Sequence, residues 1–150
     1  MATTLTAATL TVSVTEEITL NGTAYDQTVT ETFASVAKFD KRIISIPAST
    51  SSTLYTFASS PANLQFDSDE LKYLRITNLD DTSQVILTTS GASTAGAQAI
   101  NPGGSYTLMG NGVNGAASKA AITSVVVLDT IFIRNGSGAA IDIEIVIATA

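Results

Sequence analysis

The sequence predicts an all-β fold, an antiparallel β-sandwich of the jelly-roll type with an additional N-terminal β-hairpin. Thr, Ser, Ala, Ile and Val dominate the chain, whereas the strong helix formers are scarce, and this composition favours extended structure. Apolar and polar residues alternate in segment after segment, and no window of a dozen residues shows a 3.6-residue stripe. Nine or ten short strands follow one another closely, which is typical of a sandwich, jelly roll or barrel. Strand order is open at this point, so an immunoglobulin-like sandwich and a barrel remain alternatives.

The first predicted element is a hairpin within residues 1–37. Apolar residues alternate up to Leu20, and the alternation resumes after Asn21-Gly22, a dipeptide that favours a type I′ turn because both central residues need positive φ. A two-residue turn sets this register: Ile18 opposite Tyr25, Glu16 opposite Gln27, Val14 opposite Val29 and Leu10 opposite Phe33. We expect one domain, 1–150, with residues 1–37 as a hairpin or arm packed on it.

The remaining strands are predicted from the same alternation and from turn residues between them. In chain order they are "RIISI" before Pro47, "TLYTFA", "LKYLRIT", "QVILTTS", "SYTLM", "ITSVVVLDTIFIR" as one bent strand or two, and the alternating stretch Ile141 to Ile147. Residues 48–52 and 90–97 are rich in small residues and are predicted to be loops. Only "GAASKAA" has the composition for a turn or two of helix.

Composition excludes most familiar catalytic chemistry. The chain contains no Cys, His or Trp, so it has no disulfide, no zinc site with the usual ligands and no Ser-His-Asp triad. A net charge of -6 and a pI near 4.3 disfavour nucleic acid as a partner. The cluster of Lys38, Lys41 and Arg42 is interpreted as a solvated strand start. The N-terminus has no signal-peptide pattern, and no apolar stretch is long enough for a spanning helix, so we expect a soluble protein without membrane contact.

Two loop motifs resemble ligand sites. "GNGVNG", Gly110 to Gly115, matches G-x-G-x-x-G, with Asp129 downstream, but a dinucleotide site needs a following helix in a βαβ array, and β-branched residues come next. It is interpreted as a loop. "DSDE", Asp67 to Glu70, has enough carboxylates for a calcium ion but lacks the glycine and the distal glutamate of an EF-hand. It is interpreted as loop solvation, and no metal or cofactor is predicted.

The other candidates are also explained by turns or surface charge. A carboxylate pair for glycoside cleavage needs an aromatic-lined cleft, which a chain without Trp is poorly equipped to build. Asn21 and Asn135 begin N-x-S/T matches that lie in predicted turns. Asp80 and Asp81, in "TNLDDTSQ", are adjacent carboxylates, which we interpret as the exposed tip of a hairpin formed by residues 78–83. No catalytic residue is predicted, and the protein is not expected to be an enzyme.

One stretch resembles a known group of proteins. "LKYLRITNLDDTSQVILTTSG", then "INPGGSYTLM" and the closing strand "AIDIEIVIATA" resemble small structural proteins of tailed-bacteriophage virions, over residues 71–150. The resemblance implies a jelly roll or related sandwich that decorates or cements a capsid or forms part of a tail. It carries no catalytic residues and does not account for the long first hairpin.

The expected function is therefore that of a capsid decoration or cement subunit on the virion surface. Its expected partners are the major capsid protein and other copies of itself, a homotrimer being favoured, and it needs no cofactor. The alternative is a tail-associated β-sandwich module that binds a receptor or glycan through loop residues. For that role Tyr25, Tyr55, Tyr73 and Tyr106 are the available sugar-stacking side chains. The N-terminal hairpin and the loops at 90–97 and 110–115 are the expected interaction surfaces.

Overall fold

The computed structural model describes residues 6–58, 60, 65–67, 70–91, 95–109 and 128–150. Within these ranges the chain is all-β and contains no helix, which confirms the predicted fold class. The strands are β1 (Ala8–Glu16), β2 (Thr19–Leu20), β3 (Thr23–Ala24), β4 (Gln27–Val36), β5 (Lys38–Ile46), β6 (Ser51–Ala58), β7 (Phe66–Asp67), β8 (Leu71–Asn78), β9 (Val85–Ser90), β10 (Ala95–Ile100), β11 (Ser105–Met109), β12 (Thr130–Asn135) and β13 (Ile141–Thr149).

Two sheets form the sandwich, and their strand orders follow the jelly-roll pattern. One sheet has the order β10-β9-β12-β6-β7, and the other has the order β11-β8-β13-β5. Among the eight long strands from β5 onward, the first pairs with the last, β5 with β13. The next pairs lie inside it in sequence, β6 with β12, β8 with β11, and β9 with β10, all antiparallel. This nested pairing is a long hairpin rolled up on itself, which distinguishes a jelly roll from the other all-β architectures.

Aliphatic side chains from both sheets meet between the layers. Strand β13 provides four isoleucines at alternate positions, and each is at most 1 % exposed. The neighbouring strand β8 adds Leu74 and Ile76 at alternate positions, and the strands of the facing sheet, β9 and β12, add Val85, Leu87, Ile131 and Ile133. The period of two places these residues on one face of each strand, so the pattern that predicts the strands also predicts the core.

A buried asparagine ends β12 and holds the arch between β5 and β6. The Nδ2 of Asn135 donates hydrogen bonds to the carbonyl oxygens of Ile46, Pro47 and Ala139 at 3.0, 3.2 and 2.8 Å, and its Oδ1 accepts one from the amide of Ser137 at 2.8 Å. The side chain is fully buried. A single amide side chain thus provides hydrogen-bond partners for backbone groups at two places, the start of the β5–β6 connection and the β12–β13 connection.

Asn78, at the end of β8, plays the matching role on the other side. It is also fully buried, and its Nδ2 donates to the carbonyl oxygens of Ser83 and Ile100 at 2.8 and 3.1 Å. The predicted hairpin at residues 78–83 is wrong, because β8 and β9 lie in different sheets. The segment is an arch that carries the chain from one layer to the other.

Residues 90–97 also differ from the sequence prediction. The second half of this expected loop begins β10, whose Ala95 to Ile100 pair with β9 in regular antiparallel register. Small residues have weak strand propensity, so pairing with a neighbouring strand, rather than local preference, determines this element. Residues 92–94, the predicted loop 110–115, "GAASKAA" and the start of "ITSVVVLDTIFIR" lie outside the described residues.

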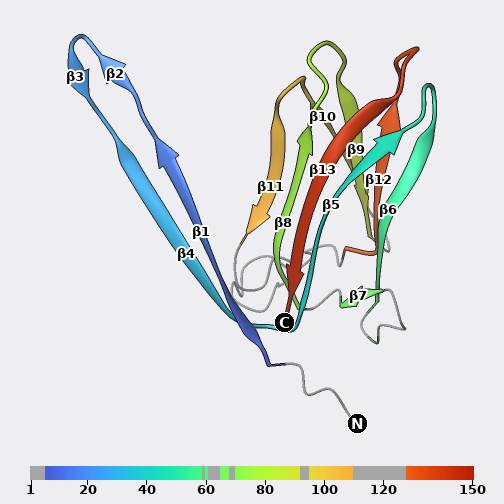
Figure 1. Cartoon of the computed structure of the whole chain (residues 1–150), viewed down its shortest axis with the longest axis horizontal. Helices are drawn as coiled ribbons and strands as arrows, with labels where there is room; N and C mark the ends of the chain where they lie inside the picture. The colour runs from blue at the N-terminus through green and yellow to red at the C-terminus, as the bar shows by residue number, and fades with distance from the viewer. Residues whose placement is uncertain (1–5, 59, 61–64, 68–69, 92–94, 110–127) are drawn as a thin grey trace.

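Residues 8–36 form a long two-stranded ribbon that projects from the sandwich (Figure 1). The predicted register is confirmed: Val14 lies opposite Val29, Leu10 opposite Phe33 and Glu16 opposite Gln27, and the amide of Tyr25 donates to the carbonyl of Ile18. Asn21 and Gly22 have φ values of 50° and 81°, as a type I′ turn requires. Strand β1 alone spans about 30 Å at the usual rise per residue.

Candidate interaction surfaces

The ribbon has two chemically different faces. On one face, hydroxyl side chains from β1 and β4 lie opposite each other, and the pairs Ser13–Thr30 and Thr15–Thr28 are hydrogen bonded at 3.0 and 3.1 Å. The alternate positions form the other face, which is mainly apolar: Leu10, Val12, Val14, Ile18, Leu20, Tyr25, Val29 and Phe33. A free two-stranded ribbon with a mainly apolar face leaves apolar area in water, and such area commonly marks an interaction site.

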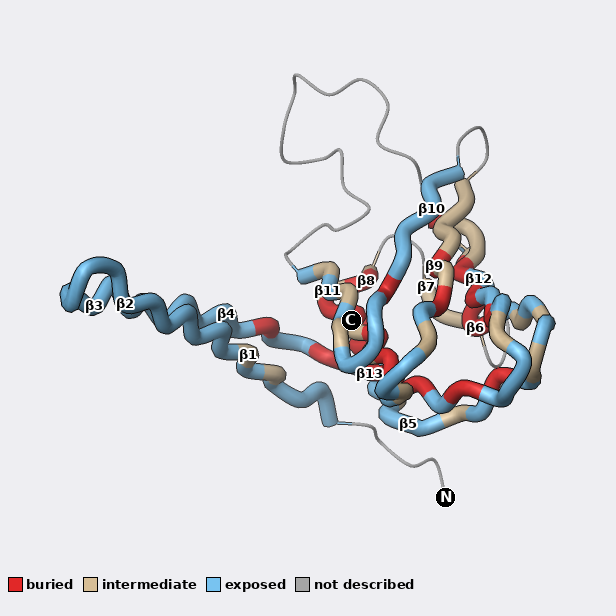
Figure 2. The backbone as a smooth tube through the Cα atoms, turned by 90° about the horizontal axis from the view of Figure 1, so that it is seen from above, coloured by how far each residue is buried: buried red, intermediate tan, exposed pale blue. Residues whose placement is uncertain are grey.

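The base of the apolar face is packed against the molecule's own sandwich. Phe33 and Val36 form a buried cluster with Tyr73, Val146 and Ala148 on the outer face of the β11-β8-β13-β5 sheet. Figure 2 shows buried positions at the base of the ribbon, a few intermediate positions on β1, and exposed positions along the rest. The ribbon is therefore anchored at one end and unpartnered along most of its length.

The far part of the same face is exposed. At the tip, Ile18, Leu20 and Tyr25 are 56 %, 57 % and 60 % exposed. These side chains belong to the same face as the buried Phe33 at the base. We call Ile18, Leu20 and Tyr25 the ribbon tip cluster.

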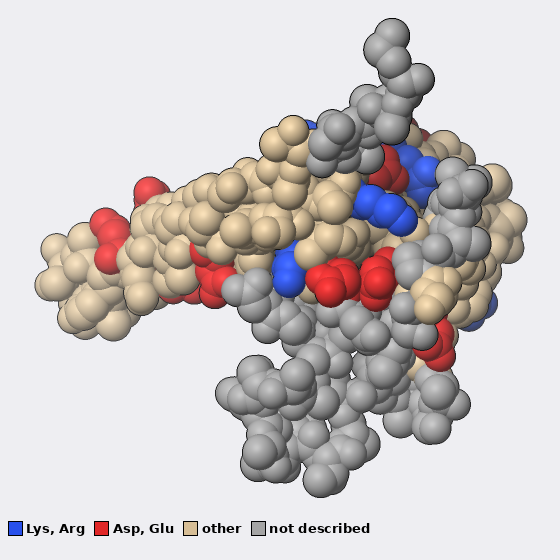
Figure 3. All heavy atoms as spheres, turned by 90° about the horizontal axis from the view of Figure 1, so that it is seen from below, with Lys and Arg blue, Asp and Glu red and all other residues tan. Residues whose placement is uncertain are grey.

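Charge separates the ribbon from the sandwich. Residues 1–37 contain four of the thirteen acidic side chains, Glu16, Glu17, Asp26 and Glu31, and none of the seven basic ones. Figure 3 shows carboxylates along the ribbon and Lys and Arg side chains on the body of the molecule. The ribbon is thus an acidic, half-apolar projection that would favour a basic, apolar partner surface.

A groove of about 680 Å³ lies at the edge of the sandwich, where β5 of one sheet meets β6 and β7 of the other. Its lining residues are Lys38, Phe39, Asp40, Arg42, Thr53, Leu54, Tyr55, Thr56, Gln65 and Phe66. Phe39, which is 53 % exposed, contributes an apolar side chain to the groove. Within the described residues, β5 is the edge strand of its sheet, which leaves its outer backbone groups unpaired.

Polar contacts organise the groove. The hydroxyl of Tyr55 donates to Oδ2 of Asp40 at 2.7 Å, and the Nε of Arg42 lies 3.3 Å from the same oxygen. The Arg42 guanidinium also lies over the Tyr55 ring, 5.2 Å from its centroid, and Phe66 meets that ring edge-on at 5.1 Å. Burial, and then the hydrogen bond to Asp40, raise the pKa of Tyr55 well above its ordinary value. The phenol is therefore a fixed hydrogen-bond donor at neutral pH.

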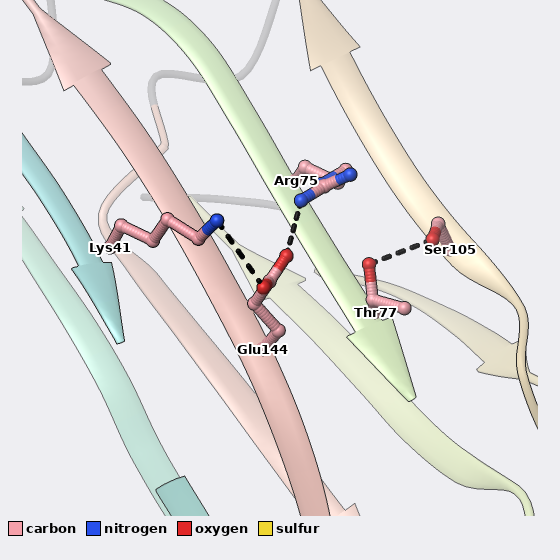
Figure 4. A network of polar contacts seen from close by, with 5 residues as sticks. All are labelled: Lys41, Arg75, Thr77, Ser105 and Glu144. Carbon is pink, nitrogen blue, oxygen red and sulfur yellow. Dashed lines mark hydrogen bonds and ion pairs between the residues drawn. The ribbon is translucent and has the colours of Figure 1, made fainter. Parts of the chain in front are cut away.

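The outer face of the β11-β8-β13-β5 sheet carries a polar network (Figure 4). Glu144 lies between Lys41, whose Nζ is 3.6 Å from its Oε2, and Arg75, which donates to its Oε1. Beside them the hydroxyls of Thr77 and Ser105 are hydrogen bonded at 2.8 Å. Each charge in this network has a partner, so it is a cross-strand stabilising contact.

Lys38, Lys41 and Arg42 lie exposed in the first half of β5, as the interpretation of a solvated strand start predicts, and their side chains divide between two sites. Lys38 and Arg42 line the groove, where Lys38 donates to the carbonyl of Gln65 at 3.1 Å, whereas Lys41 pairs with Glu144. The groove was missed in the sequence because it joins strands of different sheets. The period-two pattern that places Asp40 and Arg42 on one side of β5 was the only local signal of it.

Asp80 and Asp81 are not brought together as a reactive pair. Oδ1 of Asp80 accepts hydrogen bonds from the amides of Ser83 and Thr82 at 2.6 and 2.8 Å. The Ser83 amide, and then the Thr82 amide, hold the pKa of Asp80 below its ordinary value. Asp81 is exposed beside it. The prediction that these residues belong to a turn is confirmed, although the turn connects two sheets.

The structure places the remaining sequence candidates in separate positions. Asn21 occupies the ribbon turn, and the amide nitrogen of Asn135 is buried and hydrogen bonded, so it is not accessible to a modifying enzyme. In the acidic run 67–70, Asp67 belongs to β7, and residues 68 and 69 lie outside the described part. The Oε2 of Glu70 lies 3.9 Å from the Nζ of Lys72. The backbone of Asp129 bonds to Ser90 and Phe57. Within the described ranges, carboxylates do not gather into a group that could hold a metal ion.

Comparison with known proteins gives no relative. No protein-family model, no curated protein and no solved structure matches the chain. In the described part of the chain, no helix is long and apolar enough to cross a membrane.

Proposed function

We propose that the protein is a structural subunit of a virion, one that decorates or cements a capsid by protein-protein contacts. The single observation that carries the proposal is the ribbon, which projects from a jelly roll and leaves its tip cluster more than half exposed. A ribbon of this kind is suited to buried contact with a neighbouring subunit, because the apolar area it exposes alone is removed from water only in an assembly.

Other features of the chain support the same role. The sandwich is a jelly roll, an architecture that recurs in capsid proteins, although the fold alone does not define a function. The stretch 71–150 resembles small structural proteins of tailed phages. Short strands and few long charged side chains reduce the conformational entropy lost when surfaces are ordered at an interface.

The test is co-expression with the major capsid protein encoded in the same genome. We expect the chain to co-sediment with assembled shells and to raise the temperature at which they break, because a ligand that binds only the assembled state stabilises it. The control is the Thr19→Ser/Ala24→Ser variant, which changes only the hydroxyl face of the ribbon. If the unmodified chain stays in the supernatant and leaves the disruption temperature unchanged, the proposal is wrong.

A glycan-binding module is a second candidate, and the groove favours it. The half-buried ring of Phe66 provides aromatic surface, and Asp40 and Arg42, held by Tyr55, provide paired polar groups, which together are the elements of a sugar site. Glycan-array binding that is lost in Tyr55→Ala and retained in the ribbon variant Tyr25→Ser would support this function. If no glycan on the array binds the chain, the proposed glycan-binding function is wrong.

A further inference from the structure

We propose that the ribbon tip of one copy of the chain docks in the β5–β6 groove of a second copy. The inference rests on the proposed structural role and adds to it the identity of the two surfaces. It gives a partner both to the most exposed apolar side chains of the ribbon and to the groove between β5 and β6.

The position of the ribbon requires the occupant of the groove to come from another copy. Both views show the β2–β3 end of the ribbon as the part of the molecule farthest from the sandwich (Figures 1 and 2). The buried cluster of Phe33 and Val36 fixes the base, so the ribbon does not fold back onto its own β6. The tip and the groove of one molecule therefore point to different neighbours.

The two surfaces match in apolar character and size. The tip cluster provides two aliphatic side chains and one aromatic ring, and the groove provides the exposed ring of Phe39 and the half-buried ring of Phe66. Its volume lies within the range of about 300–1,000 Å³ that is usual for binding pockets, enough for the side chains of a hairpin end. A second hollow of about 500 Å³ shares Lys38, Phe39 and Phe66 and leads to Ala8 and Val36. An incoming ribbon would thus lie along the base of the resident one.

Charge complementarity selects the same pairing. On the face of the tip cluster the nearest carboxylate in the sequence is that of Glu16, and the groove carries Lys38 and Arg42. The groove also contains the carboxylate of Asp40, but Arg42 and the Tyr55 hydroxyl already bind it. No basic residue occurs in residues 1–37, so a second ribbon, or the tip of another acidic surface, meets no repulsion at Lys38.

A contact of this kind is head to tail, because the surface that each copy offers differs from the one it receives. Head-to-tail contacts close into rings when the rotation between copies allows it. The inference therefore predicts a head-to-tail homo-oligomer, which is a ring where this rotation closes and an open filament where it does not.

Cross-linking tests the pairing directly, because the chain has no cysteine of its own. Thr23→Cys is placed at the tip and Thr56→Cys in the groove, in separate preparations that are mixed and treated with a short bismaleimide. The control mixes Thr23→Cys with Ala140→Cys, which precedes Ile141 at the end of β13 that pairs with Ile46, whereas Lys38 pairs with Thr149 at the other end of the strand. We expect covalent heterodimer in the first mixture at several times the control yield. Equal yields in free solution and on co-expressed shells would overturn the inference.

Charge reversal provides a second test that is independent of chemical labelling. Lys38→Glu and Glu16→Lys should each weaken self-association about tenfold, and a mixture of the two variants should recover it, because the contact between the two variants then pairs the reversed charges. Light scattering across a concentration series measures the association. Recovery excludes misfolding as the cause, and two weakened variants that do not rescue each other would contradict the pairing.

The tip cluster itself is tested with a matched pair of variants. Leu20→Ser/Tyr25→Ser should abolish the oligomer, whereas Thr19→Ser/Ala24→Ser on the opposite face should retain it. Failure of the proposed function has a different signature, since shells would then not bind the chain although the cross-link still forms. If shells bind and the cross-link does not form, only the groove assignment is wrong.

Discussion

Replacing Asn135 with alanine should destabilise the sandwich more than any exposed polar change. The side chain donates to three carbonyl oxygens with two amide hydrogens and accepts one bond from the Ser137 amide. Counted as two donated bonds and one accepted bond, each worth about 1 kcal/mol net, the loss is about 3 kcal/mol. A carbonyl left buried and unpaired adds about 1–2 kcal/mol, so the variant should lose about 4–5 kcal/mol of unfolding free energy.

The assay is urea unfolding followed by far-ultraviolet circular dichroism, since the chain has no Trp. A loss of this size corresponds to a melting temperature lower by about 10 °C for a chain of this length. Asn101→Ala is the matched control, because that asparagine is exposed, and it should change stability by less than about 0.5 kcal/mol. Equal stability of the two alanine variants would show that the buried amide does not hold the arch.

Asn135→Asp refines the same test through its pH dependence. The carboxylate cannot donate, and it would face carbonyl oxygens, so burial and repulsion should raise its pKa above the unfolded value. A raised native pKa means that the variant is least destabilised at low pH and loses stability as the pH rises through the ordinary carboxyl range. A variant that instead becomes more stable with rising pH would refute the assignment of Nδ2 as the donor to these carbonyls.

Three further predictions concern separate parts of the molecule. Asp80→Asn should remove stability that is present above the unfolded carboxyl pKa and lost as the pH falls through the lowered native pKa. Equilibrium thermal melts of the variant and the unmodified chain from pH 7 to pH 2 measure this difference in stability. The same effect in Asp81→Asn would contradict the assignment to Asp80. Tyr55 should stay protonated when ordinary phenols ionise, and because its native pKa is raised, its contribution to stability should fall above pH 10. In an ultraviolet titration, the Tyr55→Phe variant should lack a component that ionises late in the unmodified chain. An unchanged titration curve would contradict this. Phe33→Ala should cost about 3–5 kcal/mol at the ribbon base and expose β1 and β4 to protease before the sandwich is cut, whereas cleavage in the sandwich first would contradict the anchoring role.

The elements that the sequence predicted well are those determined by local chemistry. Asn21-Gly22 accepts the two positive φ values of a type I′ turn, and alternation in the flanking strands leaves only one register that pairs Val14 with Val29. The isoleucines of β13 define a buried face in the same way. In each case the information lies within a few residues of the element that it determines.

Features that depend on distant pairing were not predictable in this way. Alternation before Asn78 and after Ser83 is the same for a hairpin and for an arch between sheets, and only the pairing of β8 with β13 and of β9 with β12 decides between them. Ala95 to Ile100 form a strand because β9 offers an edge, not because small residues prefer one. The groove lies between β5 and β6, which are consecutive in the chain but belong to opposite layers, so the alternation within either strand does not reveal it.

The jelly-roll topology explains why this ribbon is a well-directed projection. Strand β4 ends at Val36 and β5 begins at Lys38, so a single residue separates the ribbon from the edge of the sandwich. The amide of that residue, Ala37, donates to the carbonyl of Thr149 at 3.0 Å, and β13 pairs with β5 along its whole length. The junction is thus held by the last strand of the fold as well as by the cluster around Phe33. An arm fixed in this way loses less conformational entropy on docking than a disordered tail does, because its shape is formed before the partner arrives. Closing the roll with the C-terminal strand therefore also orients the surface through which we propose that the subunit assembles.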